Sequence, residues 1–213
     1  PIHMGSQTLY EARWAHRPSG QIRRECWGLR DLEWVQTSDD HGTSFQLTVQ
    51  GVPVFARGAN VVPPDFHDFT DEAPWLDLVQ HAVDANMNML RVWGGGVYPP
   101  TAFFEACDAR GILVWQDFMF ACAMVPDNPA FQDNVKAEAT EQVKRLRHHP
   151  SLALWCGNNE VAKAWQSWGW QEMYDLHGQD SARVAEAASG MFDGLLSEVV
   201  DEHSAAFYLP TSP

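Results

Sequence analysis

Short apolar runs alternate with segments of helical periodicity along most of the chain, and this alternation constrains the fold more than any other feature. The apolar runs lie at residues 54–58, 87–93, 111–115, 152–156 and 206–209. Apolar residues at helical spacing fill the segments between them, at 75–83, 100–110, 128–146 and 181–203. Repeated βα units with strands this apolar predict an α/β fold whose parallel sheet is buried on both faces.

Two architectures fit this pattern, an open doubly wound sheet and a closed (β/α)8 barrel. In a barrel, the chemistry lies where the strands end. The unusual residues of this chain follow the apolar runs in the same way, at Asn60, Asp65, Trp93–Gly96, Asp117 and Asn158–Glu160. Their distribution favours the barrel. A whole barrel takes about 250 residues, so residues 51–213, with four βα units and a fifth strand, predict the N-terminal half of a TIM barrel.

The first fifty residues predict β structure instead. Residues 8–12 and 24–27 are strand-like and are separated by a turn at Pro18–Gly20. Residues 44–49 alternate polar and apolar side chains, and Gln50–Gly51 then predicts a hairpin. These strands are too few to close a sandwich. We therefore expect residues 1–50 to be the C-terminal part of a β-sandwich domain.

Charge and hydropathy exclude some partners. The chain has 28 acidic and 14 basic residues, for a net charge of −14. Such a surface repels phosphate backbones and anionic lipid, so we expect no nucleic-acid and no membrane partner. No basic stretch followed by an apolar core stands at the start of the sequence, so no signal peptide is visible there. The sequence leaves both the compartment and the oligomeric state open.

The cysteines and histidines predict neither a metal site nor a cofactor. The four cysteines, at positions 26, 107, 122 and 156, are widely and irregularly spaced. We expect four reduced, buried thiols, because a disulfide framework or a zinc site needs tighter clustering. His148 and His149 are adjacent, so on a helix they point in different directions and chelate poorly.

Three polar residues stand out at the strand ends. Glu160 follows apolar Trp155 and Cys156, and a carboxyl group in such surroundings can act as a general acid near neutral pH. It can equally be an acidic residue in the first turn of the next helix, where the helix dipole favours it. Asp117 can be a buried carboxylate satisfied by backbone N–H groups. Arg91, on an inward face, must meet a carboxylate because an unpaired buried charge is costly.

Tryptophan is abundant, with ten residues. Trp165, Trp168 and Trp170 follow Glu160 closely and are either a sugar-stacking wall or a packed loop. The run Gly94–Gly96 lacks the spacing of a phosphate loop. It predicts backbone that passes close to a ligand or to Trp93.

Taken in order, four segments resemble the β-mannosidase branch of glycoside hydrolase family 2. They are Arg57–Asn60, Asn86–Gly96, Gly111–Cys122 and His149–Glu160. The resemblance extends over most of residues 5–213. It implies the end of an immunoglobulin-like domain at 1–50, followed by the first half of the catalytic barrel at 51–213. It also implies retaining hydrolysis of terminal β-D-mannose from β-mannoside oligosaccharides.

The same resemblance implies roles for individual residues. Glu160 would be the acid/base and Asn159 would hold the sugar 2-hydroxyl. Trp93 and Asp117 would line the sugar subsite, with Trp168 as a nearby wall residue. Arg91 would support the nucleophile carboxylate. The sequence Trp93–Gly95 separates this branch from the galactosidase and glucuronidase relatives, which usually carry a histidine-containing sequence there.

One departure from the family pattern affects activity. The family nucleophile is a glutamate near the end of the seventh strand, whereas this chain stops near the fifth. Retaining hydrolysis needs two carboxyl groups about 5–5.5 Å apart. We therefore expect the isolated chain not to turn over β-mannosides and, with exposed sheet edges, to be poorly stable. The alternatives are another barrel hydrolase (β-glucuronidase, β-galactosidase or endo-mannanase), a non-catalytic carbohydrate-binding fragment, and a half-barrel without function.

Overall fold

A five-stranded parallel sheet forms the centre of the computed structural model, which describes residues 1–212. Its strands are β8 (Gly58–Val61), β9 (Met89–Val92), β10 (Leu113–Asp117), β11 (Leu152–Cys156) and β12 (Phe207–Leu209). Their order in the sheet is their order in the chain. A doubly wound sheet reverses its strand order at a switch point, whereas a barrel does not. The sheet therefore fits part of an α/β barrel.

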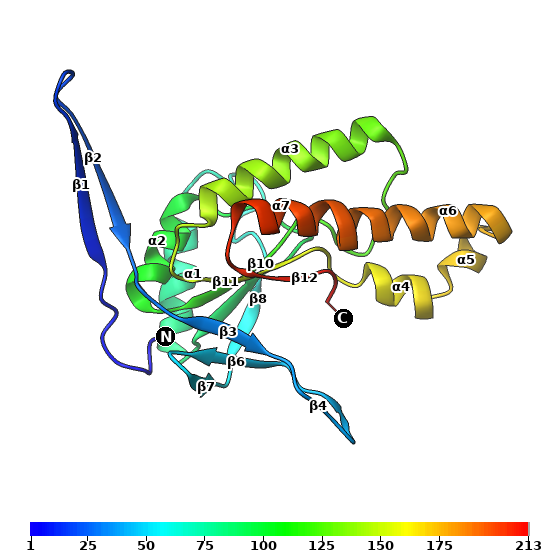
Figure 1. Ribbon diagram of the computed structural model, residues 1–213, viewed down its shortest axis with the longest axis horizontal. Helices are drawn as coiled ribbons and strands as arrows, with labels where there is room; N and C mark the ends of the chain where they lie inside the picture. The colour runs from blue at the N-terminus through cyan, green and yellow to red at the C-terminus, as the bar shows by residue number, and fades with distance from the viewer. Residues whose placement is uncertain (213) are drawn as a thin grey trace.

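Helices connect these strands along the outer face of the sheet (Figure 1). The first three connections are α1 (Ala73–Asp84), α2 (Thr101–Arg110) and α3 (Pro129–Leu146). The fourth contains α4 (Val161–Ser167), α5 (Trp170–Met173), α6 (Gly178–Ser189), the π-helix η1 (Gly190–Leu195) and α7 (Leu196–His203). The single helix predicted at 181–203 is thus α6 to α7 with a π segment in the middle.

Local signals in the sequence mark two of the helix ends as predicted. The Asn128 side chain accepts a hydrogen bond from the Phe131 N–H at 2.8 Å and caps the start of α3. Gly111, with φ 71°, ends α2 in the left-handed conformation that favours glycine.

Successive side chains of a strand point to opposite faces of the sheet, and most residues of β9, β10 and β11 are buried on both faces, whereas Gly58–Asn60 of β8 are exposed. Leu90 and Val92 face the helices and join the larger apolar cluster, with Trp75 and Phe103. Met89 and Leu113 face the other way and pack in a smaller cluster that contains Leu47 and Val49, among others. Continuous apolar strands are therefore required here, as the sequence pattern predicted.

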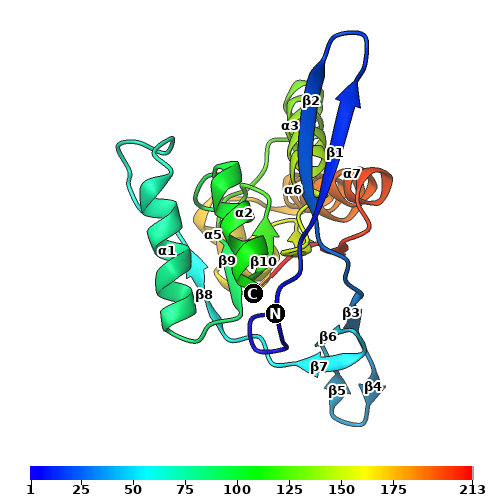
Figure 2. The same cartoon turned by 90° about the vertical axis from the view of Figure 1, so that its left-hand side faces the viewer.

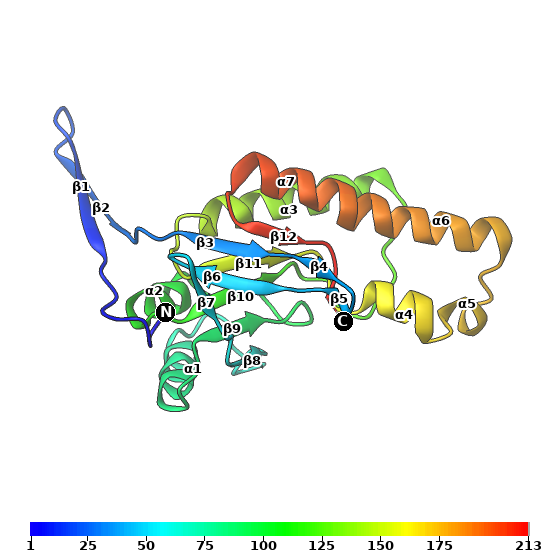
Figure 3. The same cartoon turned by 60° about the horizontal axis from the view of Figure 1, so that its bottom comes forward.

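Part of the second face is covered by an antiparallel sheet of β3 (Leu32–Val35), β6 (Gln46–Val49) and β7 (Val52–Val54), of which β3 and β6 lie in front of β10 and β11 in Figure 3. A small hairpin of β4 (Ser38–Asp39) and β5 (Gly42–Thr43) extends from it. The predicted hairpin at Gln50–Gly51 is confirmed by the pairing of β6 with β7. That hairpin spans the domain boundary expected at residue 50, which stays a prediction.

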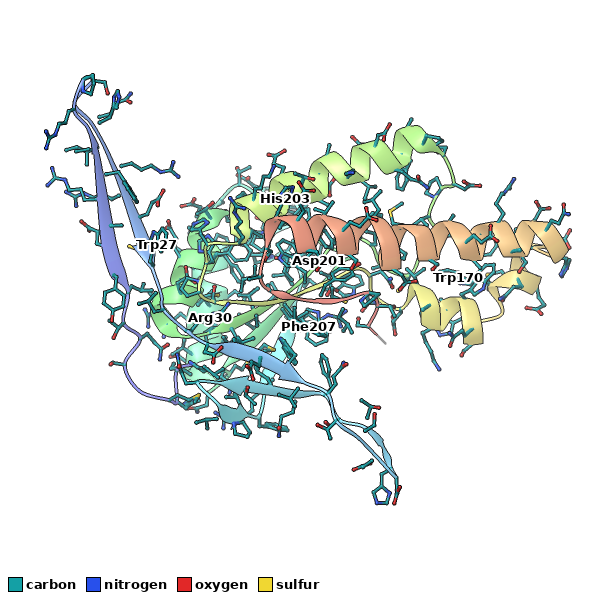
Figure 4. All side chains as sticks on the ribbon, viewed as in Figure 1. Trp27, Arg30, Trp170, Asp201, His203 and Phe207 are labelled. Carbon is teal, nitrogen blue, oxygen red and sulfur yellow. The ribbon has the colours of Figure 1, made fainter. Side chains whose placement is uncertain are left out.

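The remaining antiparallel pair, β1 (Tyr10–His16) and β2 (Gln21–Trp27), projects away from the rest of the molecule (Figures 1 and 2). The predicted turn between them is confirmed, and Gly20 adopts φ 70° in it. Trp27 lies on the projecting hairpin and is exposed (Figure 4). Tyr10 and Trp14 are exposed as well.

Two expectations need correction. The first barrel strand, expected at 54–58, is Gly58–Val61, because Val52–Val54 pairs back with β6 instead. A Cβ on Gly58 would lie 1.9 Å from the Met89 carbonyl oxygen, so the strand begins where the absence of a side chain permits close approach. Second, all four cysteines are free, but only Cys107 and Cys156 are buried, since Cys26 lies on the exposed hairpin and Cys122 on an exposed loop.

Candidate active site

The loops after β10, β11 and β12 are joined by backbone hydrogen bonds beyond the ends of the strands. The Asn159 N–H donates to the Phe120 carbonyl at 2.9 Å, and the Cys122 N–H donates to the Asn159 carbonyl at 3.0 Å. On the other side, the Glu160 N–H donates to the Ser212 carbonyl at 2.9 Å. The carboxyl ends of three neighbouring strands therefore hold the Asn159–Glu160 backbone in place.

Beneath this ladder, the partly exposed Arg91 pairs with the fully buried Asp117, which confirms that Arg91 meets a carboxylate. Arg91 Nε and Nη2 donate to the two Asp117 oxygens at 3.2 and 2.8 Å. Asp117 also accepts from the Gly94 N–H at 3.1 Å and from Trp115 Nε1 at 2.8 Å, and it is 0% exposed. Burial raises the pKa of Asp117, against the lowering effect of these three donors. Both carboxylate oxygens are therefore occupied by protein donors.

The same guanidinium reaches the residue before Glu160. Arg91 Nη2 also lies 2.8 Å from Asn159 Oδ1 and 2.5 Å from Ser212 Oγ, so its two N–H groups are shared among three acceptors, Asp117 included. An arginine has no acceptor, so the Asn159 amide must turn its oxygen toward Arg91 and its nitrogen the other way. That nitrogen donates to Glu160 Oε2 at 2.9 Å. The donor-only guanidinium of Arg91 thus sets the orientation of the amide that meets Glu160.

Glu160 is a partly exposed residue with the left-handed backbone conformation φ 62°, ψ 8°. It lies at the N-cap of α4, just past β11, but its side chain makes no capping hydrogen bond. Instead its Oε2 accepts from Asn159 and from the Cys122 thiol, the latter at 3.4 Å. Glu160 thus lies at the start of the next helix and also contacts the polar side chains of Asn159 and Cys122, so both interpretations of Glu160 fit its position and its role stays a prediction.

Trp93 and the glycines after it form the neighbouring rim. Trp93 follows β9, and a Cβ on Gly95 would lie 2.1 Å from its indole ring. A Cβ on Gly94 would lie 2.6 Å from the carbonyl oxygens of both Phe118 and Phe120. The prediction that this backbone passes close to Trp93 is confirmed, and Gly94 fits equally closely against the loop after β10.

Gly94→Ala is expected to destabilise the fold by about 1–3 kcal/mol, because the added methyl meets backbone that cannot move aside cheaply. A urea titration monitored by tryptophan fluorescence measures the change. Gly194→Ala is the matched control: Gly194 lies within η1 with open space around its Cβ, so alanine there should leave the midpoint unchanged or raise it. Equal midpoints for Gly94→Ala and the parent protein would contradict the close packing.

The three tryptophans after Glu160 do not form one wall. Trp165 lies on α4 and packs against the core, and Trp170 begins α5 with only 6% of its surface exposed. In Figure 4 Trp170 lies under α6. Trp168 is 43% exposed and packs edge-on against Trp170. Of these indoles, Trp168 is therefore the most exposed, while Trp165 and Trp170 line a small cavity between α4 and α6.

Sequence reasoning missed Cys122 and Ser212. Cys122 carries the unusual φ of 51°, and Ser212 is buried beside Arg91.

Across residues 1–212, no group of three or more His, Cys, Asp or Glu side chains is placed to hold a metal ion. In the same part of the chain, no helix combines the length and apolarity needed to cross a membrane.

No protein-family model matches the chain. Individual known proteins do match it, and the three described next are all β-mannosidases. A β-mannosidase from Bos taurus is 44% identical over 178 residues, which are 81% of this chain and 20% of that protein. A β-mannosidase B from Neosartorya fischeri is 37% identical over 100% of this chain and 26% of its own length. The crystal structure of a β-D-mannosidase from Dictyoglomus thermophilum is 38% identical with a TM-score of 0.87, covering 98% of this chain and 25% of that one. The chain thus spans a fifth to a quarter of these proteins.

Proposed function

This chain belongs to the β-mannosidase family, and on that basis we propose that it supplies the acid/base half of a retaining active site for β-mannosides. The observation that carries the proposal is the placement of Glu160. Its carboxyl group is partly exposed at the end of a barrel-like strand, and its Oε2 is held by the Asn159 amide, which Arg91 orients. In such a site, a carboxylic acid protonates the glycosidic oxygen and then, as carboxylate, takes a proton from the attacking water.

The other predicted residues are proposed to act as follows. The second Nδ2 proton of Asn159 has only the weak acceptor Cys122 Sγ at 3.5 Å, so a sugar hydroxyl that enters the site can accept a hydrogen bond from it. Trp93 and Trp168 supply indole faces for the pyranose. Asp117 serves the subsite indirectly, by fixing Arg91 and the Gly94 backbone, because its oxygens have no free position for a sugar hydroxyl.

Retention requires a nucleophile carboxylate about 5–5.5 Å from Glu160. Asp117 is unsuited to this role, since it is fully buried and accepts hydrogen bonds from Arg91, Gly94 and Trp115. We therefore propose that the nucleophile carboxylate comes from outside residues 1–212. That carboxylate would be a second partner for Arg91, besides Asp117.

The substrate proposal is tested with a chimera in which this chain replaces the matching quarter of the Dictyoglomus thermophilum β-D-mannosidase. We expect the chimera to release nitrophenol from the β-D-mannoside at least tenfold faster than from the β-D-glucuronide, β-D-galactoside and β-D-glucosaminide. The 213-residue chain alone is expected to release none. A preference for another glycoside would assign the site to a different barrel hydrolase. Release by the chain alone, lost in Glu160→Ala, would place the nucleophile within it.

A further inference from the structure

Glu160 has a second polar neighbour besides Asn159, and it comes from a different strand. Cys122 lies in the loop after β10, five residues beyond the strand end at Asp117, while Glu160 follows β11. The Cys122 thiol donates to Glu160 Oε2 at 3.4 Å, and its sulfur accepts from Asn159 Nδ2 at 3.5 Å. The three side chains therefore form a closed ring of contacts, Cys122 to Glu160 to Asn159 and back.

The backbone holds this ring from both sides. Cys122 and Glu160 both have positive φ, 51° and 62°, a conformation that residues other than glycine avoid and that recurs at functional sites. The Cys122 N–H donates to the Asn159 carbonyl at 3.0 Å, so the two loops are paired where the side chains meet. Ala121 and Asn159 also form a β-bridge. The position of the thiol is thus set by the same ladder that sets Glu160.

We propose that Cys122 is a positioning residue for the acid/base, whose thiol, together with the Asn159 amide, fixes the Glu160 carboxyl in the orientation needed for proton transfer. The inference rests on the proposed role of Glu160. Two donors on Oε2 leave Oε1 without a partner among the side chains of residues 1–212, so Oε1 is the oxygen free to face a glycosidic oxygen.

The thiol must be protonated to donate, and its surroundings favour that form. Cys122 is exposed as a residue, but partial desolvation of its thiol raises its pKa, and the hydrogen bond to Glu160 and the negative charge of that carboxylate raise it further. The Asn159 amide acts in the opposite direction. Removing the charge of Glu160 should therefore lower the pKa of the Cys122 thiol. Because the thiolate is the nucleophile, the thiol should then react faster.

The first experiment measures the alkylation of Cys122 by iodoacetamide as a function of pH, with peptide mass mapping to separate the cysteines. Cys26 is the internal reference because it is exposed and lies on the projecting hairpin, and Cys107 and Cys156 are buried. In Glu160→Gln, we expect Cys122 to react about three- to tenfold faster near pH 8, with Cys26 unchanged. An unchanged Cys122 rate would overturn the proposal. This readout needs no hydrolysis, so it is independent of the proposed function.

The second experiment follows the pH profile of kcat/KM in the active chimera. In Cys122→Ala, the carboxylate loses a donor, so the basic limb should move to higher pH and kcat should fall more than KM rises. Cys122→Ser keeps a donor and should restore the parent profile. Identical profiles for parent and Cys122→Ala would overturn the positioning role. A parent chimera without β-mannosidase activity would refute the proposed function, and the thiol rates would then decide the role of Cys122 by themselves.

Discussion

Glu160→Gln in the chimera is expected to lower kcat/KM for a β-mannoside with a poor leaving group by about 10²–10⁴-fold. Glutamine keeps the size of the side chain and can still meet Asn159, but it has no proton to give to the glycosidic oxygen. With a dinitrophenyl leaving group, which departs without protonation, the loss of the first step should be much smaller. Steady-state rates over a series of aryl mannosides measure this dependence on the leaving group.

The matched control for this change is Glu172→Gln, which removes the same charge from an exposed position on α5. It should leave the rates unchanged for every leaving group. A loss in Glu160→Gln that is equal across the series would indicate that Glu160 is needed for binding or folding rather than for proton transfer.

Asp117→Ala is expected to destabilise the protein by about 3–5 kcal/mol, the largest effect on stability that we predict. The substitution leaves the Arg91 guanidinium, whose side chain is 16% exposed, without a counter-charge. Asn159 and Ser212 remain as acceptors, but both are neutral. The free energy of unfolding from urea titration gives the cost.

The double variant Arg91→Met with Asp117→Leu separates the ion pair from packing. Because replacing both partners removes the unpaired charge, the double variant should be more stable than Asp117→Ala. A cost below about 1 kcal/mol for Asp117→Ala would mean that solvent reaches Arg91 and that the pair does not hold the site together.

The sequence allowed the parallel sheet to be predicted because its central strands, β9 to β11, are buried on both faces, which leaves a pattern of apolar runs. The start of β8 could not be predicted in the same way. Residues 52–56 are apolar throughout and lead directly into Arg57 and Gly58, and only the pairing of Val52–Val54 with β6 separates β7 from β8. Three indoles close in sequence gave a similar ambiguity, since burial of Trp170 and exposure of Trp168 depend on the turn at Gly169.

In the site, the pairing of Arg91 with a carboxylate was predictable from the cost of burying a lone charge on an inward-facing strand position. The contacts of Cys122 and Ser212 were not. They depend on a left-handed turn at Cys122 and on bridges that continue past the strand ends, and neither leaves a periodic pattern in the sequence. Whether the open sheet edges make the chain poorly stable stays a prediction.

The most direct test of Glu160 as the acid/base is to add azide to the Glu160→Ala chimera with dinitrophenyl β-D-mannoside. The anion attacks a glycosyl-enzyme intermediate without needing a general base, so this variant should form β-mannosyl azide and regain turnover while the parent does not. Formation of that product by Glu160→Ala is the result that we predict. Full activity of the variant without azide, or no azide product and no rescue in an otherwise folded chimera, would contradict the assignment.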